Sequence, residues 1–322
     1  MDDCLNGIVN QTYKNIEVIV VDDCSPDKAV DVIKKWQLKD PRIVLVHHEK
    51  NKGLPAARNT GVAKVTGDYV RHVDSDDVIP YDSTEKLVRI AVDTGSDIVC
   101  GNAARLTSEG IKRESWLARH MEHKSHIVFG DEPKLWPHLG NVYTYLFKRT
   151  FLVEHKLNFH EPVMYGEDQV FVSKAMPLAS SISFCPSYTY YYRDNGDSMT
   201  YGLSLKKISD ELTWPLLVRE NLSEHPRAFF YTLLRSSKHR FKVLTDAVSV
   251  YSREQCLAFI CDAKKCYEGI TTADLYSEDA EKMYIYFRSN TVHLLNLFIN
   301  ESPEKIYEIL SSRIKSKYLI ES

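Results

Sequence analysis

The sequence predicts an α/β fold in which a mostly parallel sheet has helices on both faces, followed by a helical C-terminal subdomain. Three observations lead to this prediction. Short β-branched runs alternate with helical patterns over roughly the first 200 residues. Polar clusters follow two of the expected strands, at the edge of a parallel sheet where ligands bind. After about residue 200, helical periodicity continues while strand patterns largely stop.

The individual elements follow from hydrophobic periodicity. Residues 16–21 form an almost continuous β-branched run, which predicts a strand covered on both faces. The next segments alternate, with helices expected at 26–38, 54–65 and 83–92 and strands at 43–46, 69–73 and 97–100. Helical patterns then cover 228–243, 254–267, 280–299 and 303–318. We therefore expect an α/β domain over residues 1–200 and a helical subdomain over residues 201–322.

Composition limits the classes of function. The net charge of −3 gives no positive field for a nucleic acid. No apolar run approaches the ~20 residues that span a bilayer, and the N-terminus lacks the pattern of a secretory signal. The seven cysteines are scattered without a paired framework, as is usual in a reducing compartment. These features predict a cytoplasmic globular protein without a nucleic-acid partner.

Three carboxylates, Asp74, Asp76 and Asp77, lie within four residues directly after an expected strand. Because like charges repel, a bound cation is the simplest reason to hold them together. Asp74 and Asp76 at i and i+2 suit Mg²⁺ or Mn²⁺, which take waters and substrate phosphates as further ligands. A calcium EF-hand is excluded, because Val78 and Ile79 stand where a ligand and a glycine are needed. A solvated acidic loop is the remaining alternative.

These carboxylates end a longer run of matching motifs. The run starts at Asn51 with the pattern N-x-G-x-x-x-A-R-N-x-G, continues through Gly-Asp-Tyr at the next strand, and ends with D-x-D-D at Asp74. Upstream, residues 10–25 also match, with Cys24 where glycine is usual. Together, over residues 1 to about 200, the chain resembles the inverting family 2 glycosyltransferases, which have the GT-A fold.

The resemblance implies roles on the donor side. Asp22 or Asp23 would accept a hydrogen bond from the base of a nucleotide-sugar, usually uracil. Arg58 would contact the nucleotide, although an ordinary surface ion pair is the alternative for this residue. Asp74 would lie on the ribose side of the metal site, and Asp76 would ligate the Mn²⁺ or Mg²⁺ that bridges the diphosphate.

It also implies roles on the acceptor side. Glu167 and Asp168 resemble the family's E-D motif, in which Asp168 would be the general base and Glu167 would orient the acceptor. Both could instead simply cap a helix. Arg193, in a pattern similar to Y-R-x-x-x-x-S, would help to hold the diphosphate or the acceptor, unless this tyrosine-rich strand is plain core.

The implied function is the transfer of a hexosyl or N-acetylhexosaminyl group from a UDP-sugar, with inversion, to a glycan or lipid-linked acceptor in bacterial surface polysaccharide biosynthesis. The alternative is a catalytically impaired homologue that binds a nucleotide or a partner. Residues 143–148 replace the family's usual tryptophan-asparagine-lysine segment, which leaves the type of acceptor open. The family's usual first strand has no counterpart ahead of the helix expected at 2–10, and we expect the gene to continue in frame upstream and encode it.

The last helix has a stripe of apolar residues with a basic flank. The stripe comprises Ile306, Ile309, Leu310, Ile314 and Tyr318. Such a helix can lie on the inner face of the plasma membrane, near lipid-linked acceptors. The alternative is that the stripe packs on the helical subdomain or on another copy of the chain in a homo-oligomer.

Overall fold

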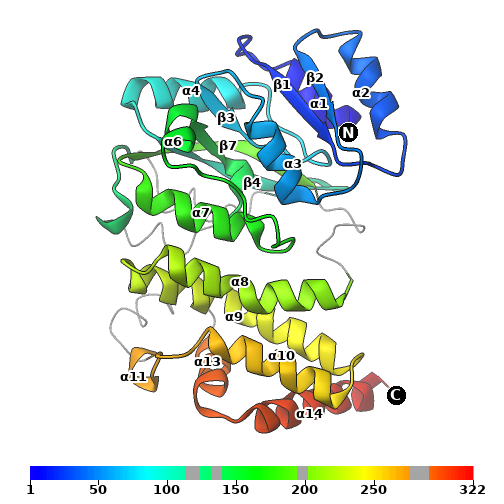
Figure 1. Ribbon diagram of the computed structural model, residues 1–322, viewed down its shortest axis with the longest axis vertical. Helices are drawn as coiled ribbons and strands as arrows, with labels where there is room; N and C mark the ends of the chain where they lie inside the picture. The colour runs from blue at the N-terminus through cyan, green and yellow to red at the C-terminus, as the bar shows by residue number, and fades with distance from the viewer. Residues whose placement is uncertain (113–123, 132–139, 194–201, 276–289, 322) are drawn as a thin grey trace. The chain divides into compact units, whose positions relative to one another are not determined.

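The computed structural model describes residues 1–112, 124–131, 140–193, 202–275 and 290–321 (Figure 1). The chain divides into two compact units, Met1–Met199 and Thr200–Ser322. Strands and helices alternate in the first unit, whereas the described part of the second unit contains helices without strands.

The first unit contains the elements that the sequence predicts and several that it does not. In chain order they are α1 (Asp2–Val9), β1 (Val18–Asp22), α2 (Ala29–Gln37), β2 (Ile43–His47), α3 (Leu54–Val62), β3 (Tyr69–Arg71), α4 (Ser83–Thr94), β4 (Ile98–Thr107), β5 (Gly110–Lys112), η1 (Phe129–Asp131), η3 (Val142–Thr144), β6 (Tyr145–Lys148), α6 (Arg149–Glu154), α7 (Glu167–Leu178) and β7 (Ile182–Arg193). The strands β5 and β6 were not expected, whereas β7 contains the tyrosine-rich strand that the sequence indicates around Arg193.

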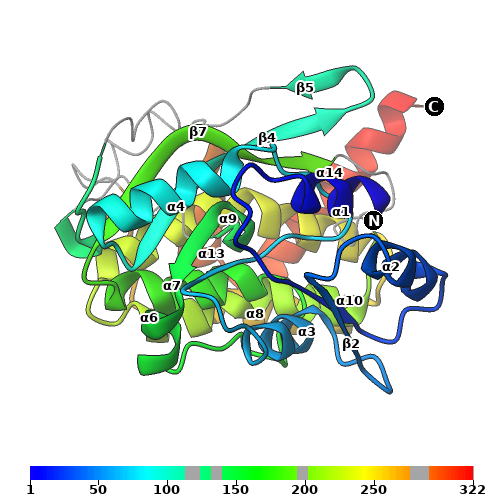
Figure 2. The same cartoon turned by 90° about the horizontal axis from the view of Figure 1, so that it is seen from above.

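The strands form two sheets. β1 and β2 pair in parallel, with Val18 opposite Ile43. The second sheet has the order β3-β6-β4-β5, and β7 pairs with β4 in parallel. β6 runs antiparallel to both of its neighbours, and β5 closes a hairpin with β4 (Figure 2). The α/β class is thus confirmed, but the larger sheet is mixed rather than mostly parallel, because the unexpected strand β6 runs against β3 and β4.

No strand pair joins the two sheets within the described residues. There, β1 pairs with β2 alone and β3 pairs with β6 alone.

Helices cover both faces of the larger sheet, and β6 shows how. Leu146 packs into a cluster with Leu87 and Ala91 of α4. The next residue, Phe147, points to the opposite face, where its ring meets that of Phe171 of α7 at 5.6 Å between centroids. This alternation is what a period of two requires. The prediction of helices on both faces is confirmed (Figure 1).

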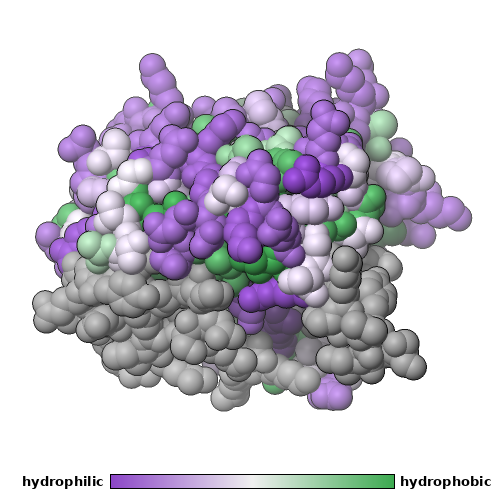
Figure 3. All heavy atoms as spheres, turned by 90° about the horizontal axis from the view of Figure 1, so that it is seen from below, coloured by the Kyte–Doolittle hydropathy of each residue, from purple (hydrophilic) through white to green (hydrophobic). Residues whose placement is uncertain are grey.

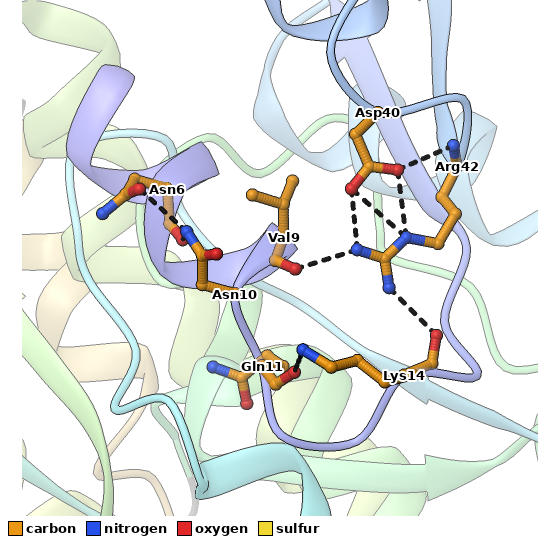
Figure 4. A network of polar contacts seen from close by, with 7 residues as sticks. All are labelled: Asn6, Val9, Asn10, Gln11, Lys14, Asp40 and Arg42. Atoms are coloured by element: carbon orange, nitrogen blue, oxygen red, sulfur yellow. Dashed lines mark hydrogen bonds and ion pairs between the residues drawn. The ribbon is translucent and has the colours of Figure 1, made fainter.

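Arg42 fastens α1 to the start of the small sheet. Its guanidinium donates hydrogen bonds to the carbonyl oxygens of Val9 and Lys14, at 2.8 and 2.9 Å, and pairs with the Asp40 carboxylate (Figure 4). Because Val9 is the last residue of α1, the first of these bonds satisfies a carbonyl that a helix end leaves open. Since Arg42 directly precedes β2, the arrangement fixes the last turn of α1 near the N-terminal ends of β1 and β2.

The second unit is built from helices around an aromatic core. They are α8 (Leu205–Asn221), α9 (Pro226–Val248), α10 (Arg253–Lys265), α11 (Thr272–Leu275), α13 (Asn290–Asn300) and α14 (Pro303–Glu321). Tyr267 stacks on Phe298, with 4.9 Å between ring centroids. Its hydroxyl accepts a hydrogen bond from the fully buried Arg240. The prediction of a helical C-terminal region is confirmed, although the first part of the helix expected at 280–299 lies outside the described residues.

The apolar stripe of the last helix is at least partly internal. Ile306 and Leu310 are fully buried within the second unit, which favours packing over membrane contact for this half of the stripe. The side chains of Ile314 and Tyr318 lie outside the described residues. No described helix is both long and apolar enough to cross a membrane. The face seen in Figure 3 has hydrophobic residues scattered among hydrophilic ones, with no broad apolar area among its coloured residues.

Candidate functional site

Two histidines at the end of β2 hold the two carboxylates at the end of β1. Parallel pairing sets Asp22 opposite His47, and the Nδ1 atom of His47 lies 2.6 Å from the Asp22 carboxylate. The His48 Nδ1 atom lies 2.6 Å from the Asp23 carboxylate in the same way. Sequence reasoning missed both histidines. The available signal was their position at the end of the strand that pairs with β1.

The two carboxylates differ in how much ligand they could contact. The Asp22 side chain is 1% exposed, whereas that of Asp23 is 17% exposed. Burial alone would raise the pKa of Asp22, but hydrogen bonds from Ser25 and His47 outweigh it and hold the pKa below its usual range. Of the two candidates for the base-binding carboxylate, only Asp23 keeps appreciable surface for a ligand.

Asp23 also organises the loop before α3. Its carboxylate accepts hydrogen bonds from the backbone amides of Lys52 and Gly53, at 2.9 and 2.6 Å. Gly53 has φ +91°, and a Cβ there would collide with the Met164 side chain. The glycine of the N-x-G pattern is therefore needed for its backbone conformation, whereas the end of the flexible Met164 side chain can move away from a Cβ.

Cys24 directly follows Asp23 in the chain, and its side chain is exposed. Its backbone is in the left-handed conformation, with φ 59°. A residue with a Cβ is strained there, whereas glycine is not. We expect Cys24→Gly to raise the free energy of unfolding by up to about 1 kcal/mol, measured by urea unfolding. The matched control is Cys261→Gly, at an exposed position inside α10, which should lower it by about 1 kcal/mol. Equal losses in the two variants would contradict the strain.

The acidic loop after β3 separates its three carboxylates. Asp77 is 1% exposed, whereas Asp76 is exposed. The side chain of Asp74 is 27% exposed. The Asp77 carboxylate accepts hydrogen bonds from the Tyr190 hydroxyl and the Arg193 amide, both at 2.7 Å. Burial raises its pKa to about 6. Asp77 therefore anchors the loop from inside, and the charges presented outward belong to Asp74 and Asp76.

Two residues of β7 complete this anchor. The Tyr190 hydroxyl also accepts a hydrogen bond from the Asp74 amide, at 3.1 Å. The Arg193 guanidinium donates to the Asp76 carbonyl at 2.9 Å and pairs with Asp3 of α1 at 2.8 Å. The structure thus places Arg193 directly beside the acidic loop, where its guanidinium binds the Asp76 carbonyl and Asp3 of α1 rather than a residue of the acceptor side.

Arg58 joins the acidic loop to the start of α7. Its guanidinium lies 2.9 Å from an Asp74 carboxylate oxygen and 2.8 Å from a Glu167 carboxylate oxygen, and its side chain is only 8% exposed. Burial opposes the charge, but the two carboxylates outweigh it and raise the pKa of Arg58. The surface ion pair considered for Arg58 is thus wrong, because this guanidinium is buried and bridges two residues that are 93 positions apart in the chain.

Glu167 and Asp168 begin α7 and differ in their surroundings. Glu167 is buried, and burial together with the neighbouring Asp168 raises its pKa to about 7 against the opposing effect of Arg58. Asp168 is partly exposed, and its carboxylate accepts a hydrogen bond from the backbone amide of Asn141 at 2.9 Å. Asp168 therefore has the accessible carboxylate of the pair, as a group that removes a proton from a ligand requires.

The carboxylates of Asp74 and Asp76 suit a magnesium or manganese ion whose remaining ligands come from water and substrate. Within the described residues no group of three or more His, Cys, Asp or Glu side chains is arranged to hold a metal. Mg²⁺ and Mn²⁺ sites commonly use one or two carboxylates plus waters and substrate phosphates. Arg58 engages one oxygen of Asp74, and a carboxylate has about four lone-pair positions. Asp74 and Asp76 therefore fit such an ion.

Comparisons with known proteins agree with this geometry. Residues 1–164, about half of the chain, match the family model described as Glycosyl transferase family 2. The chain is 30% identical over 208 residues to the poly(ribitol-phosphate) beta-glucosyltransferase of Bacillus spizizenii, a match covering 62% of this chain and 31% of that protein. The chain spans less than two thirds of the length of the first curated relatives that it matches.

Two solved structures show the fold. S. aureus TarS 1–349 in complex with UDP-GlcNAc is similar with a TM-score of 0.71 at 18% identity, covering 98% of this chain and 88% of that chain. The mannosyltransferase PcManGT from Pyrobaculum calidifontis, in complex with GDP-Man and Mn²⁺, is similar with a TM-score of 0.55 at 17% identity, covering 92% and 81%. The expected GT-A fold is thereby confirmed.

Proposed function

This chain belongs to glycosyl transferase family 2, and on that premise we propose that it transfers a hexosyl or N-acetylhexosaminyl group from a UDP-sugar, with inversion, to a glycan or lipid-linked acceptor of a surface polysaccharide. The observation that carries the proposal is the Arg58 bridge, which brings Asp74 of the donor side and Glu167 of the acceptor side to one guanidinium. The nucleotide-sugars bound by TarS and PcManGT support the class of donor.

On the donor side, Asp23 would accept a hydrogen bond from the base, and Asp74 and Asp76 would hold Mn²⁺ or Mg²⁺. A divalent cation bound there would stabilise the negative charge that develops on the departing diphosphate. Arg58 and the Tyr190–Asp77 contact keep the acidic loop in place for this task.

On the acceptor side, Asp168 would take the proton of the attacking hydroxyl. The acceptor oxygen then forms a bond to the anomeric carbon as the bond from that carbon to the diphosphate oxygen breaks. A single displacement from the opposite face inverts the configuration. Glu167, buried against Arg58, would position Asp168 and the acceptor rather than exchange the proton.

Calorimetry of UDP binding tests the donor half of the proposal. The wild type should bind UDP at least about tenfold more tightly with Mn²⁺ than without it, which corresponds to about 1.4 kcal/mol. Asp76→Ala should lose this dependence, because it removes a metal ligand. Asp93→Ala, at an exposed position of α4, is the matched control and should behave as the wild type. Wild-type affinity that ignores Mn²⁺ would refute the metal-dependent transferase.

A further inference from the structure

Three tyrosine rings form a stack that leads from the core to the surface. Tyr190 is fully buried, and the ring of Tyr143 lies on it with 4.3 Å between centroids and 26° between planes. Tyr143 also stacks with Tyr192, at 6.2 Å. Tyr143 and Tyr192 are both partly exposed. The buried ring therefore supports two rings that reach the surface.

The stack stands between the predicted base and the acidic loop. Tyr143 lies in η3, two residues after Asn141, whose amide donates to the Asp168 carboxylate. On the other side, the Tyr190 hydroxyl contacts Asp77 and the Asp74 amide. Burial, followed by the charges of Asp168, Asp74 and Asp77, raises the pKa of the Tyr143 hydroxyl, so all three carboxylates act on this ring.

The hydroxyls of the outer two rings, those of Tyr143 and Tyr192, are available to a ligand. A buried tyrosine hydroxyl usually finds a partner, as that of Tyr190 does. The hydroxyls of Tyr143 and Tyr192 make no hydrogen bond to any part of the chain that the structure describes. Stacking on a buried support fixes the ring of Tyr143 without using its hydroxyl. Such a ring is rigid and retains both apolar and polar surface for a ligand.

We infer that Tyr143, with Tyr192 beside it, forms the acceptor subsite and binds an uncharged pyranose ring. This inference rests on the proposed function. The negative π-face of an aromatic ring attracts the C–H bonds on one face of a sugar, as it attracts other positively polarised groups. The carboxylates of Asp74 and Asp168, which are both partly exposed, would repel a sugar that carries its own carboxylate. The subsite therefore selects neutral over acidic sugars.

Saturation-transfer NMR tests the inference with defined probes. We would record spectra of methyl β-D-glucopyranoside, methyl β-D-galactopyranoside and their N-acetylglucosamine analogue with protein, UDP and Mn²⁺. At least one should receive saturation from the wild type, and methyl β-D-glucuronide should not. Tyr143→Ala should raise the Kd of the bound glycoside at least about fivefold, while Tyr143→Phe keeps the ring and should keep most of the affinity. Tyr81→Ala, at another exposed tyrosine, is the control.

Each outcome decides the question. Binding to none of the three neutral glycosides, equal binding of the glucuronide, or unchanged affinity in Tyr143→Ala would overturn the subsite. Loss of UDP affinity in Tyr143→Ala would also overturn it, because that would show a merely structural role. UDP calorimetry on the same wild-type sample distinguishes a failure of the acceptor subsite from a failure of the proposed function. Metal-dependent UDP binding without a Tyr143 effect refutes the subsite alone, whereas absent UDP binding refutes the proposed function.

Discussion

Replacing Asp168 with asparagine should lower the turnover number of sugar transfer by roughly 10²–10⁴-fold, the usual contribution of a general base. Asparagine keeps the size of the side chain and can still accept the hydrogen bond from the Asn141 amide through its oxygen. It cannot take a proton from an acceptor hydroxyl. The acidic loop and Arg58 remain untouched, so UDP affinity in the presence of Mn²⁺ should equal that of the wild type.

The measurement pairs steady-state transfer from the UDP-sugar that the wild type uses with calorimetry of UDP. Glu167→Gln is the matched variant on the neighbouring residue, and it should impair transfer far less, because the amide oxygen can still accept a hydrogen bond from Arg58. If Glu167→Gln were the more damaging change, the roles of the two residues would be reversed. The pKa of about 7 at Glu167 makes this comparison necessary, since such a value suits a base near neutral pH.

Replacing Arg58 with methionine should lower the free energy of unfolding by about 3 kcal/mol, the lower end of the cost of breaking a buried ion pair. The lower end applies because Asp74 is 27% exposed and water screens part of its charge. Methionine fills a similar volume beside Phe159, whose ring lies 5.2 Å from the guanidinium. The loss would therefore report on charge rather than on a cavity.

The effect of this change should depend on pH. Without Arg58, the pKa of Glu167 would rise above its present value of about 7, whereas in the unfolded chain it is near 4.5. When the pKa of a carboxyl group is higher in the folded than in the unfolded chain, the free energy of unfolding falls as pH rises from the unfolded pKa to the folded pKa. The difference from the wild type should thus be larger at pH 8 than at pH 6, measured by urea unfolding. Arg89→Met, at an exposed position, is the control. A pH-independent loss would contradict the role of Glu167.

The residues that we propose for the donor side could be named from the sequence, because they are close together in the chain. The Asn51–Gly61 pattern and the D-x-D-D run have fixed spacings, and the structure places them where two strands end. The identity of the more accessible carboxylate could not be predicted. Whether Asp22 or Asp23 faces outward depends on the pleat of β1 and on the histidines of the paired strand.

The anchors of the site could not be read from spacing. The sequence places Asp77 in the acidic run after a strand, but it does not show that the Asp77 carboxylate binds Tyr190, which is 113 residues away. The strand β6 is four residues long, and its apolar residues carry no information on direction. In each case the deciding contact comes from a distant segment, so local patterns give the element types but not the pairing.

The anchoring of the acidic loop by β7 has a consequence for the order in which this protein acquires its site. A ribosome delivers the N-terminal segment first, at about 5–20 residues per second. The Asp77 carboxylate can form its hydrogen bonds only after Tyr190 and Arg193 have been synthesised, 113 and 116 residues later. Contacts of such long range form late because the chain between them must first be closed into a loop. A fragment ending at residue 164, where the family match stops, would contain every donor-side carboxylate and still lack Glu167, Tyr190 and Arg193. The nascent chain therefore has its acidic residues early, and the anchor of the acidic loop can form only after β7 has left the ribosome.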